Sequence, residues 1–259
     1  MAKLKLFTYN LRVDVPQDGR NSFANRRDLI RTRFPAYEAG LVGFQETVPH
    51  MRRWLMEAFP DYEVCGLGRE ADLQGESNPI AYRRELFDLA GLDQFWLSDT
   101  PDLPGSRFAT DQSSCPRLCT AATLFHRETG KLLRFYNTHL DHEGPTAQAQ
   151  GLSLILARMA ADYVRRPMPV ILTGDFNAYP DSLVYRSAQG FAGCGLPLAD
   201  VTQATGGTFH DFGRLQPAEK IDYIFTNLPC LGPAFLAEDQ EDGVYLSDHY
   251  PVGVELELS

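Results

Sequence analysis

The chain has 259 residues and a formal charge of −10, because 34 Asp and Glu outnumber 24 Lys and Arg. Hydrophobic residues make up 44% and charged residues 22%, an ordinary globular composition that excludes collagen-like, coiled-coil and wholly disordered chains. The acidic balance disfavours bulk electrostatic capture of duplex nucleic acid, although it leaves room for a local basic groove.

The cysteines and the first ten residues give an indication of the cellular compartment. Five cysteines cannot all pair within one chain, which favours a reducing environment. The first ten residues hold two lysines but no apolar run of signal-peptide length, and no stretch is long enough for a membrane span. We therefore expect a cytoplasmic protein without membrane insertion or an evident obligate protein partner. A processed secreted form would present the same features.

Periodicity and turn residues predict the elements in chain order. The segment 3–12 alternates apolar and polar residues, as a half-buried strand does. Ser22 precedes a helix that we expect to stop at Gly40, and Gly130 lies in the short loop of a hairpin. The other expected strands are 41–46, 62–68, 79–82, 86–89, 120–126, 132–140, 169–173, 220–226 and 251–258, and the expected helices are 23–39, 49–58, 147–166 and 181–188.

The order of these elements predicts an α/β fold. No linker separates two regimes of composition, so we interpret 1–259 as a single domain. Helices are interspersed among about ten strands, which favours two sheets faced by helices.

Acidic, amide and imidazole side chains recur where apolar strands end. They are Asn10, Glu46, His139, Asp175, Asn177, Asp222, Asp248 and His249. In packed sheets such strand ends meet at one rim, where clefts form. Several carboxylates in one cleft repel one another unless a cation lies among them, and oxygen ligands without thiolates suit Mg²⁺ or Mn²⁺.

Six motifs, taken together in this order, resemble the endonuclease/exonuclease/phosphatase superfamily of metal-dependent phosphodiesterases. They are Tyr9-Asn10, Gly43-Phe44-Gln45-Glu46, Asn137-Thr138-His139, Gly174-Asp175-Phe176-Asn177, Ile221-Asp222-Tyr223-Ile224 and Ser247-Asp248-His249-Tyr250-Pro251-Val252. They span nearly the whole chain. The resemblance implies a four-layered α/β sandwich, in which two mixed β-sheets pack face to face between helices.

By position, the resemblance also implies a metal site and a catalytic set. Glu46 corresponds to the principal metal ligand, with Asn10 beside it and Asp248 assisting. Asp175 and Asn177 correspond to the pair that orients the attacking water and holds the phosphate. His249, fixed by Asp222, and His139, with Glu76 as its acidic partner, correspond to the two histidines. The candidates for substrate contact are Glu76, Asn78, Arg117 and His210.

Some residues have plainer interpretations. Asn137 is expected to be a hydrogen-bonded core amide. Arg12 stands where abasic-site enzymes carry a metal-binding acid, and the nearby Asp14 is expected to be an exposed turn acid. The helical arginines could track phosphates or simply form a solvated face; they are Arg26, Arg27, Arg31 and Arg33.

The sequence thus predicts a Mg²⁺- or Mn²⁺-dependent hydrolase that cleaves phosphodiester bonds by direct in-line attack of water. Nucleic acid is the expected substrate, by resemblance. The alternative is a smaller phosphate ester, such as a phospholipid head group, sugar phosphate or nucleotide. A catalytically inactive binding module is a third interpretation, which the presence of Glu46 and of the Asp248-His249 pair argues against.

Overall fold

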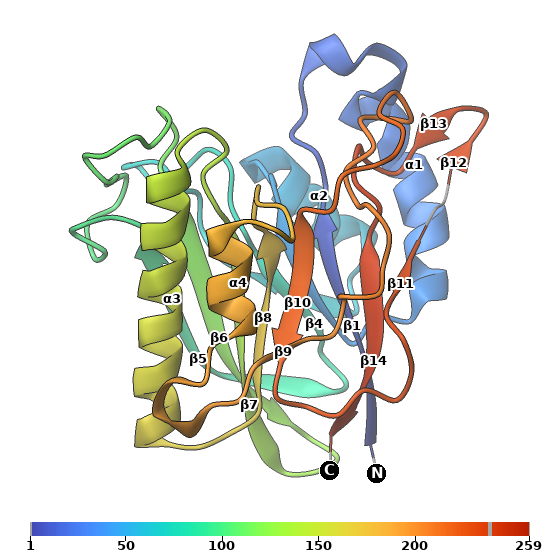
Figure 1. Ribbon diagram of the computed structural model, residues 1–259. Coiled ribbons are helices and arrows are strands. Elements are labelled where there is room, and N and C mark those ends of the chain that lie inside the picture. Colours follow the sequence, from blue (N-terminus) through green and yellow to red (C-terminus); the bar gives the residue numbers. More distant parts are fainter. Residues whose placement is uncertain (1, 238–239, 259) are drawn as a thin grey trace.

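Two six-stranded mixed sheets form the centre of the molecule (Figure 1). The computed structural model describes residues 2–237 and 240–258. The first sheet has the order β11 (Phe235–Leu236), β14 (Val252–Leu258), β1 (Ala2–Asn10), β2 (Leu41–Gln45), β4 (Ile80–Arg83), β3 (Tyr62–Cys65). The second has the order β5 (Phe87–Trp96), β6 (Leu118–His126), β7 (Lys131–His139), β8 (Val170–Asp175), β10 (Asp222–Thr226), β9 (Ala199–Asp200).

One parallel pair lies near the centre of each sheet, β1 with β2 and β7 with β8, and the neighbouring pairs are antiparallel. A separate two-stranded ladder joins β12 (Gln240–Glu241) to β13 (Val244–Tyr245).

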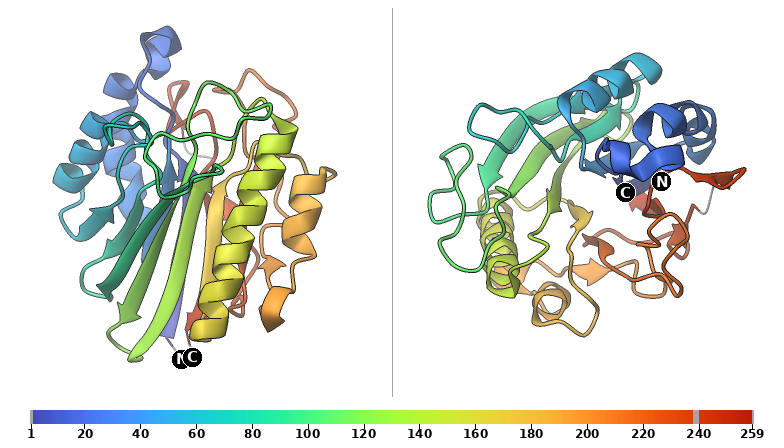
Figure 2. Two further views of the ribbon diagram at one scale, coloured as in Figure 1. Left: turned by 90° about the vertical axis from the view of Figure 1, so that its left-hand side faces the viewer. Right: turned by 90° about the horizontal axis from the view of Figure 1, so that it is seen from above.

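Helices cover the outer face of each sheet, which gives the molecule four layers (Figure 2). On the first sheet these are α1 (Phe23–Arg33) and α2 (Pro49–Ala58), and on the second α3 (Pro145–Arg165) and α4 (Leu183–Gln189). Short 3₁₀ helices occupy Pro16–Asn21, Phe34–Tyr37 and Gly193–Gly195. The four-layered sandwich predicted from the sequence is confirmed. No helix in the described part of the chain is long and apolar enough to span a bilayer.

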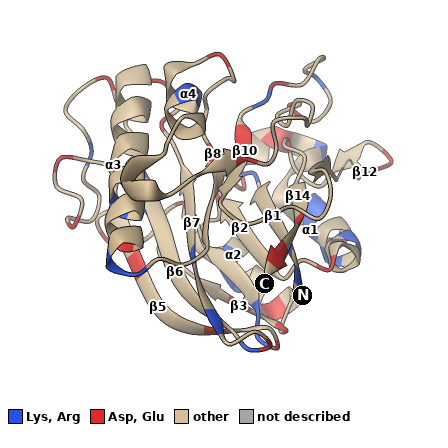
Figure 3. Ribbon diagram, turned by 60° about the horizontal axis from the view of Figure 1, so that its bottom comes forward, with Lys and Arg blue, Asp and Glu red and all other residues tan. Residues whose placement is uncertain are grey.

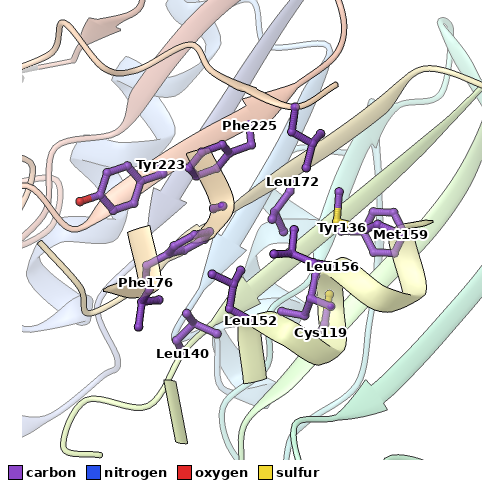
Figure 4. Packing of buried hydrophobic residues seen from close by; sticks show 14 of the residues in the cluster. Cys119, Tyr136, Leu140, Leu152, Leu156, Met159, Leu172, Phe176, Tyr223 and Phe225 are labelled. Carbon is purple, nitrogen blue, oxygen red and sulfur yellow. The ribbon is translucent and has the colours of Figure 1, made fainter. Parts of the chain in front are cut away.

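Three hydrophobic clusters fill the three spaces between the layers. The first packs α3 and α4 onto the second sheet and includes Leu152, Met159, Phe176 and Phe225 (Figure 4). The second lies between the two sheets, and the third packs α1 and α2 onto the first sheet. Burial of apolar surface on both faces of each sheet is the main stabilising term of such a sandwich.

A polar seam formed by Gln45, Asn137 and Thr173 lies between the two sheets near the rim, where the sheets come close together. Gln45 Nε2 donates to Asn137 Oδ1 at 2.7 Å, and Asn137 Nδ2 donates to the carbonyls of Phe44 and Pro79. A side chain at Gly43 would collide with the side chains of Asn137 and Thr173. Asn137 is therefore the buried, hydrogen-bonded core amide that the sequence predicted, and the glycine of Gly-Phe-Gln-Glu permits the contact.

The predicted bounds differ most from the structure in two elements. The expected helix 23–39 ends at Arg33 and continues as a 3₁₀ turn, because Pro35 cannot donate to an α-helical hydrogen bond. The strand expected at 86–89 extends to Trp96 through a bulge between Leu89 and Gly91. Apolar and polar residues do not alternate there, since Leu89, Ala90 and Leu92 are all exposed, so the pattern did not predict the second half of the strand.

Candidate active site

The strand ends of both sheets meet at one rim. In the second sheet, His139 of β7 and Asp222 of β10 are both register partners of Asp175 in β8. In the first sheet, Asn10 of β1 is the partner of Gln45, which precedes Glu46. The structure thus brings together the strand-end residues that the sequence singled out.

Backbone geometry turns several of these side chains toward the rim. Arg12, Glu46 and Asn177 have φ of 58°, 59° and 48°, in the left-handed region that residues other than glycine rarely adopt. Each follows the end of a strand. Strained backbone of this kind persists where surrounding contacts hold it, and it is common at functional sites.

Glu46 is held by two donors. Its Oε2 accepts from the Val13 amide at 2.8 Å and its Oε1 from Asn10 Nδ2 at 2.9 Å. Burial alone would raise the pKa of Glu46, but these hydrogen bonds and the positive charges of His249 and Arg12 outweigh burial and lower it. Glu46 is therefore a carboxylate, ready to bind a cation.

Asn10 connects the two central acids. Its Nδ2 also lies 3.0 Å from Asp175 Oδ2, while its Oδ1 accepts from the Arg12 amide at 2.9 Å. The side chain thus presents its donor, not its oxygen, to Glu46 and Asp175. A metal-ligand role for Asn10 stays a prediction that would require the amide to turn over.

Asp175 is a buried acid with a raised pKa. It is 2% exposed, and its Oδ1 accepts from the Asn177 amide at 2.9 Å. Burial and the nearby charge of Asp222 raise the pKa of Asp175 to about 7. A pKa near neutrality suits a group that accepts a proton during turnover.

Asp222 and His249 form a buried pair. His249 Nδ1 lies 2.8 Å from Asp222 Oδ2, and its Nε2 lies 3.8 Å from Asp175 Oδ2. Burial would lower the pKa of His249, but the charge of Asp222 and their hydrogen bond outweigh burial and raise it. Ser247 fixes this segment to β1, because its hydroxyl donates to the Asn10 carbonyl at 2.7 Å. His249 is thus held as an imidazolium facing Asp175.

His139 lies on the other side of Asp175 and has a different environment. Its Nε2 is 2.9 Å from Asn177 Nδ2 and 3.5 Å from Asp175 Oδ2, and its Nδ1 has no hydrogen-bond partner among the described residues. Burial, then the positive charges of Arg117 and Arg69, hold the pKa of His139 well below its usual range. His139 is therefore a neutral imidazole.

The acidic partner expected for His139 is engaged elsewhere. Glu76 accepts two hydrogen bonds from Arg69, at 2.8 and 3.0 Å. The Glu76–His139 pairing that the resemblance implied is not observed in this structure. Arg69 has taken its place as the partner of Glu76, because the two side chains project from neighbouring backbone positions joined by the Arg69 N–H to Glu76 carbonyl bond.

A cavity of about 570 Å³ opens over this cluster. The residues that line it are Arg12, Val13, Glu46, Arg69, Glu76, Cys115, Arg117, His139, His142, Asp175, Asn177, Tyr179, Phe209, Glu219, Ile221, Asp248 and His249. Asn10 and Asp222 lie behind this lining and contact it. A cavity of this volume suits a small molecule or one group of a larger one.

Two predicted substrate contacts lie outside that lining. Asn78 is 6% exposed and donates to the Leu118 carbonyl at 3.0 Å. His210 accepts from the Gly213 amide and stacks on Tyr250 with 4.0 Å between ring centroids. Contact of either with substrate stays a prediction, and these positions favour a supporting role in the wall.

Arg12 and Asp14 have different ion-pair partners. Arg12 pairs with Asp18 at 3.0 Å and lies 3.5 Å from Asp248. Asp14 pairs with His50 instead. Arg12 therefore brings a cation to the cavity where the abasic-site enzymes carry an acid.

Several lining residues were not predicted from the sequence, among them Phe209 and Arg69. Phe209 packs against the His249 ring, with centroids 4.9 Å apart, and Arg69 holds Glu76. Both lie in loops between strands, where no periodicity marks a residue. The one feature of the sequence that could have indicated them is the recurrence of polar and aromatic residues in the long loops. That signal is weak.

Comparison with known proteins agrees with this geometry. A family model described as the Endonuclease/Exonuclease/phosphatase family matches residues 7–249. The fold and the rim cluster thus belong to a class of phosphoester hydrolases. The chain is a member of the endonuclease/exonuclease/phosphatase family, and the resemblance carried by the six motifs is confirmed.

Several proteins are similar over most or all of their length. An endonuclease/exonuclease/phosphatase from Bacteroides vulgatus is 31% identical, with 100% of each chain covered and a TM-score of 0.88. A mannosyl-6-phosphatase from Bacteroides thetaiotaomicron is 28% identical over 98% of this chain and 100% of its own, with a TM-score of 0.84. An uncharacterized protein of Acanthamoeba polyphaga mimivirus is 24% identical over 249 residues, which cover 88% of this chain and 90% of its own.

Proposed function

We propose that this chain hydrolyses a phosphate ester at the Glu46–Asp175–His249 cluster with the help of Mg²⁺ or Mn²⁺. The observation that carries the proposal is the gathering of buried acids around Asp175, whose pKa is raised to about 7 by burial and by Asp222. Ligand atoms of Glu46, His139 and Asp175 lie within 4.8 Å of one another. This oxygen-rich donor set fits a hard divalent cation.

Glu46 would hold the cation, and Asp248 and Asn10 are the further candidates at its side. A divalent cation bound there would polarise the phosphoryl oxygen and stabilise the leaving oxyanion. The carboxylate state of Glu46 supports this assignment, because a protonated acid would bind a cation poorly.

The remaining residues would orient the water and the phosphate. Asp175, with its near-neutral pKa, accepts a proton from the attacking water. The positive charge of His249, held by Asp222, faces the negative charge that builds up on the phosphoryl group. Asn177 orients Asp175 through its amide and donates from Nδ2.

The reaction is a direct in-line displacement. A bond forms between the water oxygen and phosphorus, the phosphorus–ester oxygen bond breaks, and one proton ends on the departing alkoxide. No covalent enzyme intermediate is involved. The pair of proton-carrying groups needed for this exchange is Asp175 and His249, which face each other across 3.8 Å.

A small phosphate ester is the substrate we propose in preference to nucleic acid, which the sequence analysis placed first. Three features support it. The net charge is −10, acidic and basic segments are interspersed over the ribbon (Figure 3), and the cavity has the volume of a small-molecule site. The mannosyl-6-phosphatase relative adds an example of such a substrate in a similar chain.

The test is hydrolysis of p-nitrophenyl phosphate and bis(p-nitrophenyl) phosphate with Mg²⁺, with Mn²⁺ and with EDTA. We expect turnover with either cation and none with EDTA. Glu46→Gln and His249→Gln should each lower kcat/KM on the order of a thousandfold. Cation-independent turnover, or variants as active as the wild type, would show that the site is elsewhere.

A further inference from the structure

Three segments that are far apart in the sequence form one wall of the cavity. Phe209 and Glu219 exchange backbone hydrogen bonds, the N–H of each donating to the carbonyl of the other at 2.8 Å. Phe209 is also the bridge partner of His249. Directly opposed residues of antiparallel segments carry their side chains on the same face. His249, Phe209 and Glu219 therefore form a row, and all three line the cavity.

The chemical character of this row changes along its length. His249 is the cation beside Asp175, and the Phe209 ring packs on it with 4.9 Å between ring centroids. Glu219 stands two segments away from His249, roughly 10 Å at the usual spacing of neighbouring strands. A ligand whose phosphate lies at His249 would thus meet an aromatic face first and an acid beyond it.

Glu219 is oriented by a tyrosine. Tyr179, which also lines the cavity, donates from its hydroxyl to Glu219 Oε2 at 2.8 Å. This hydrogen bond raises the pKa of Tyr179, so the phenol keeps its proton. Lys220 donates to Thr202 and Thr205 instead, and within the described residues no basic side chain forms an ion pair with Glu219. Glu219 thus presents a negatively charged hydrogen-bond acceptor to the cavity.

This arrangement favours one kind of ester over others. A carboxylate only accepts hydrogen bonds, so its matching ligand group is a donor such as a hydroxyl. The Phe209 ring beside it offers an apolar surface to carbon–hydrogen groups. A second phosphate or another anionic group near Glu219 would be repelled. The wall therefore suits a neutral alcohol that is rich in hydroxyl groups, as a sugar is.

We propose that Glu219, held by Tyr179, accepts hydrogen bonds from the hydroxyl groups of a sugar, so that the substrate is a sugar with a single phosphate ester. This inference rests on the proposed function and names its substrate class. Glu219 selects for the hydroxyl groups by accepting from them, and it selects against a second anionic group by its charge. Tyr179 is a positioning residue, because it acts through Glu219.

The test compares hexose 6-phosphates with cyclohexylmethyl phosphate, which has the same six-membered ring size and CH₂–O–P linkage but no hydroxyl group. The hexoses are glucose, mannose and galactose, and Mn²⁺ is present throughout. We expect the wild type to prefer at least one hexose 6-phosphate in kcat/KM. Glu219→Gln, which keeps the shape and loses the charge, should lower this preference about tenfold. Tyr179→Phe should lower it about threefold.

Glucose 1,6-bisphosphate isolates the effect of charge. The wild type should disfavour it relative to glucose 6-phosphate, and Glu219→Gln should reduce this discrimination by about threefold or more. Glu128→Gln is the matched control, because Glu128 is an exposed acid in the loop between β6 and β7. It should keep both ratios of the wild type. Each ratio is measured within one variant, so partial misfolding does not imitate the expected result.

Several results would overturn the inference and leave the proposed hydrolysis standing. Tyr179→Phe and Glu219→Gln could keep the wild-type preference, or the wild type could prefer cyclohexylmethyl phosphate. Turnover of p-nitrophenyl phosphate without turnover of any hexose phosphate would have the same meaning. If Glu219→Gln does not fold, the ratio measured for Tyr179→Phe decides. No turnover of any ester with either cation would instead refute the proposed function, and this inference with it.

Discussion

At the scale of single residues, Arg26 shows how one buried charge organises the rim. It is 0% exposed and donates to the carbonyls of Leu11, Arg12, Asn21 and Leu246. These carbonyls belong to the segment after β1 and to the residue that precedes the Ser-Asp-His motif. The sequence analysis offered two roles for the helical arginines, tracking phosphates or forming a solvated face. Neither role applies to Arg26, because its side chain lies inside the protein.

Replacing Arg26 should therefore destabilise the folded protein. Arg26→Met leaves several buried carbonyls without donors, and we expect a loss of about 3 kcal/mol or more in the free energy of unfolding. Arg27→Met on the exposed side of the same helix is the control and should change it by less than about 0.5 kcal/mol. Urea unfolding measures both. Equal small losses would mean that the Arg26 hydrogen bonds contribute little.

His210 makes stability depend on pH. Burial, then the charge of His249, lower its pKa to about 4, against about 6.5 in an unfolded chain. Between these values the unfolded state binds a proton that the folded state does not, so stability falls as pH drops from about 6.5 to 4. His210→Gln, which cannot titrate, should lose less stability between pH 7 and 5 than the wild type. Chemical unfolding at the two pH values tests this, and parallel losses would contradict it.

The strand-end residues could be predicted because they follow short apolar runs whose ends must meet at a rim. Asp175 and Glu46 are such residues. What could not be predicted is which partner each side chain takes. Glu76 pairs with Arg69 rather than with His139, and that choice depends on loop geometry that has no sequence period. The same holds for Phe209, which reaches His249 from a distant loop.

At the scale of elements, the close approach of the two sheets depends on Gly43 in β2. A Cβ there would stand 2.5 Å from Asn137 Oδ1 and closer still to the side chain of Thr173. The polar seam that joins β2 to β7 and β8 cannot move apart without losing its hydrogen bonds.

We therefore expect Gly43→Ala to lower the free energy of unfolding by about 1–3 kcal/mol through overpacking, and to lower turnover by displacing Glu46. Gly91→Ala in β5 is the matched control, since its Cβ would meet Thr123 at an ordinary 3.7 Å. Thermal unfolding and kcat/KM of the two variants test this expectation. A Gly43→Ala protein as stable and active as Gly91→Ala would contradict the account of the seam.

The regular elements were predictable where one pattern dominated. The helix at Pro49–Ala58 begins with a proline and has an amphipathic period, and its predicted bounds agree with the structure. The two-residue strands β9, β11, β12 and β13 were not predicted, because pairing with a neighbour and not their own composition defines them.

At the scale of the whole molecule, net charge bears on the substrate. A chain with a charge of −10 should bind a polyanion weakly, and salt should weaken that binding further. We expect no nicking of plasmid DNA at about 150 mM salt under conditions in which p-nitrophenyl phosphate is fully hydrolysed, with a deoxyribonuclease as positive control. Nicking that persists at this salt concentration would restore nucleic acid as the substrate.

The central claim is that a divalent cation binds at Glu46, next to Asp175 and His249. Anomalous diffraction from crystals soaked in Mn²⁺ tests it most directly. We expect an anomalous peak at the Glu46 carboxylate in the wild type and its loss in Glu46→Gln crystals of the same form. A peak elsewhere, or one that remains in Glu46→Gln, would contradict the account.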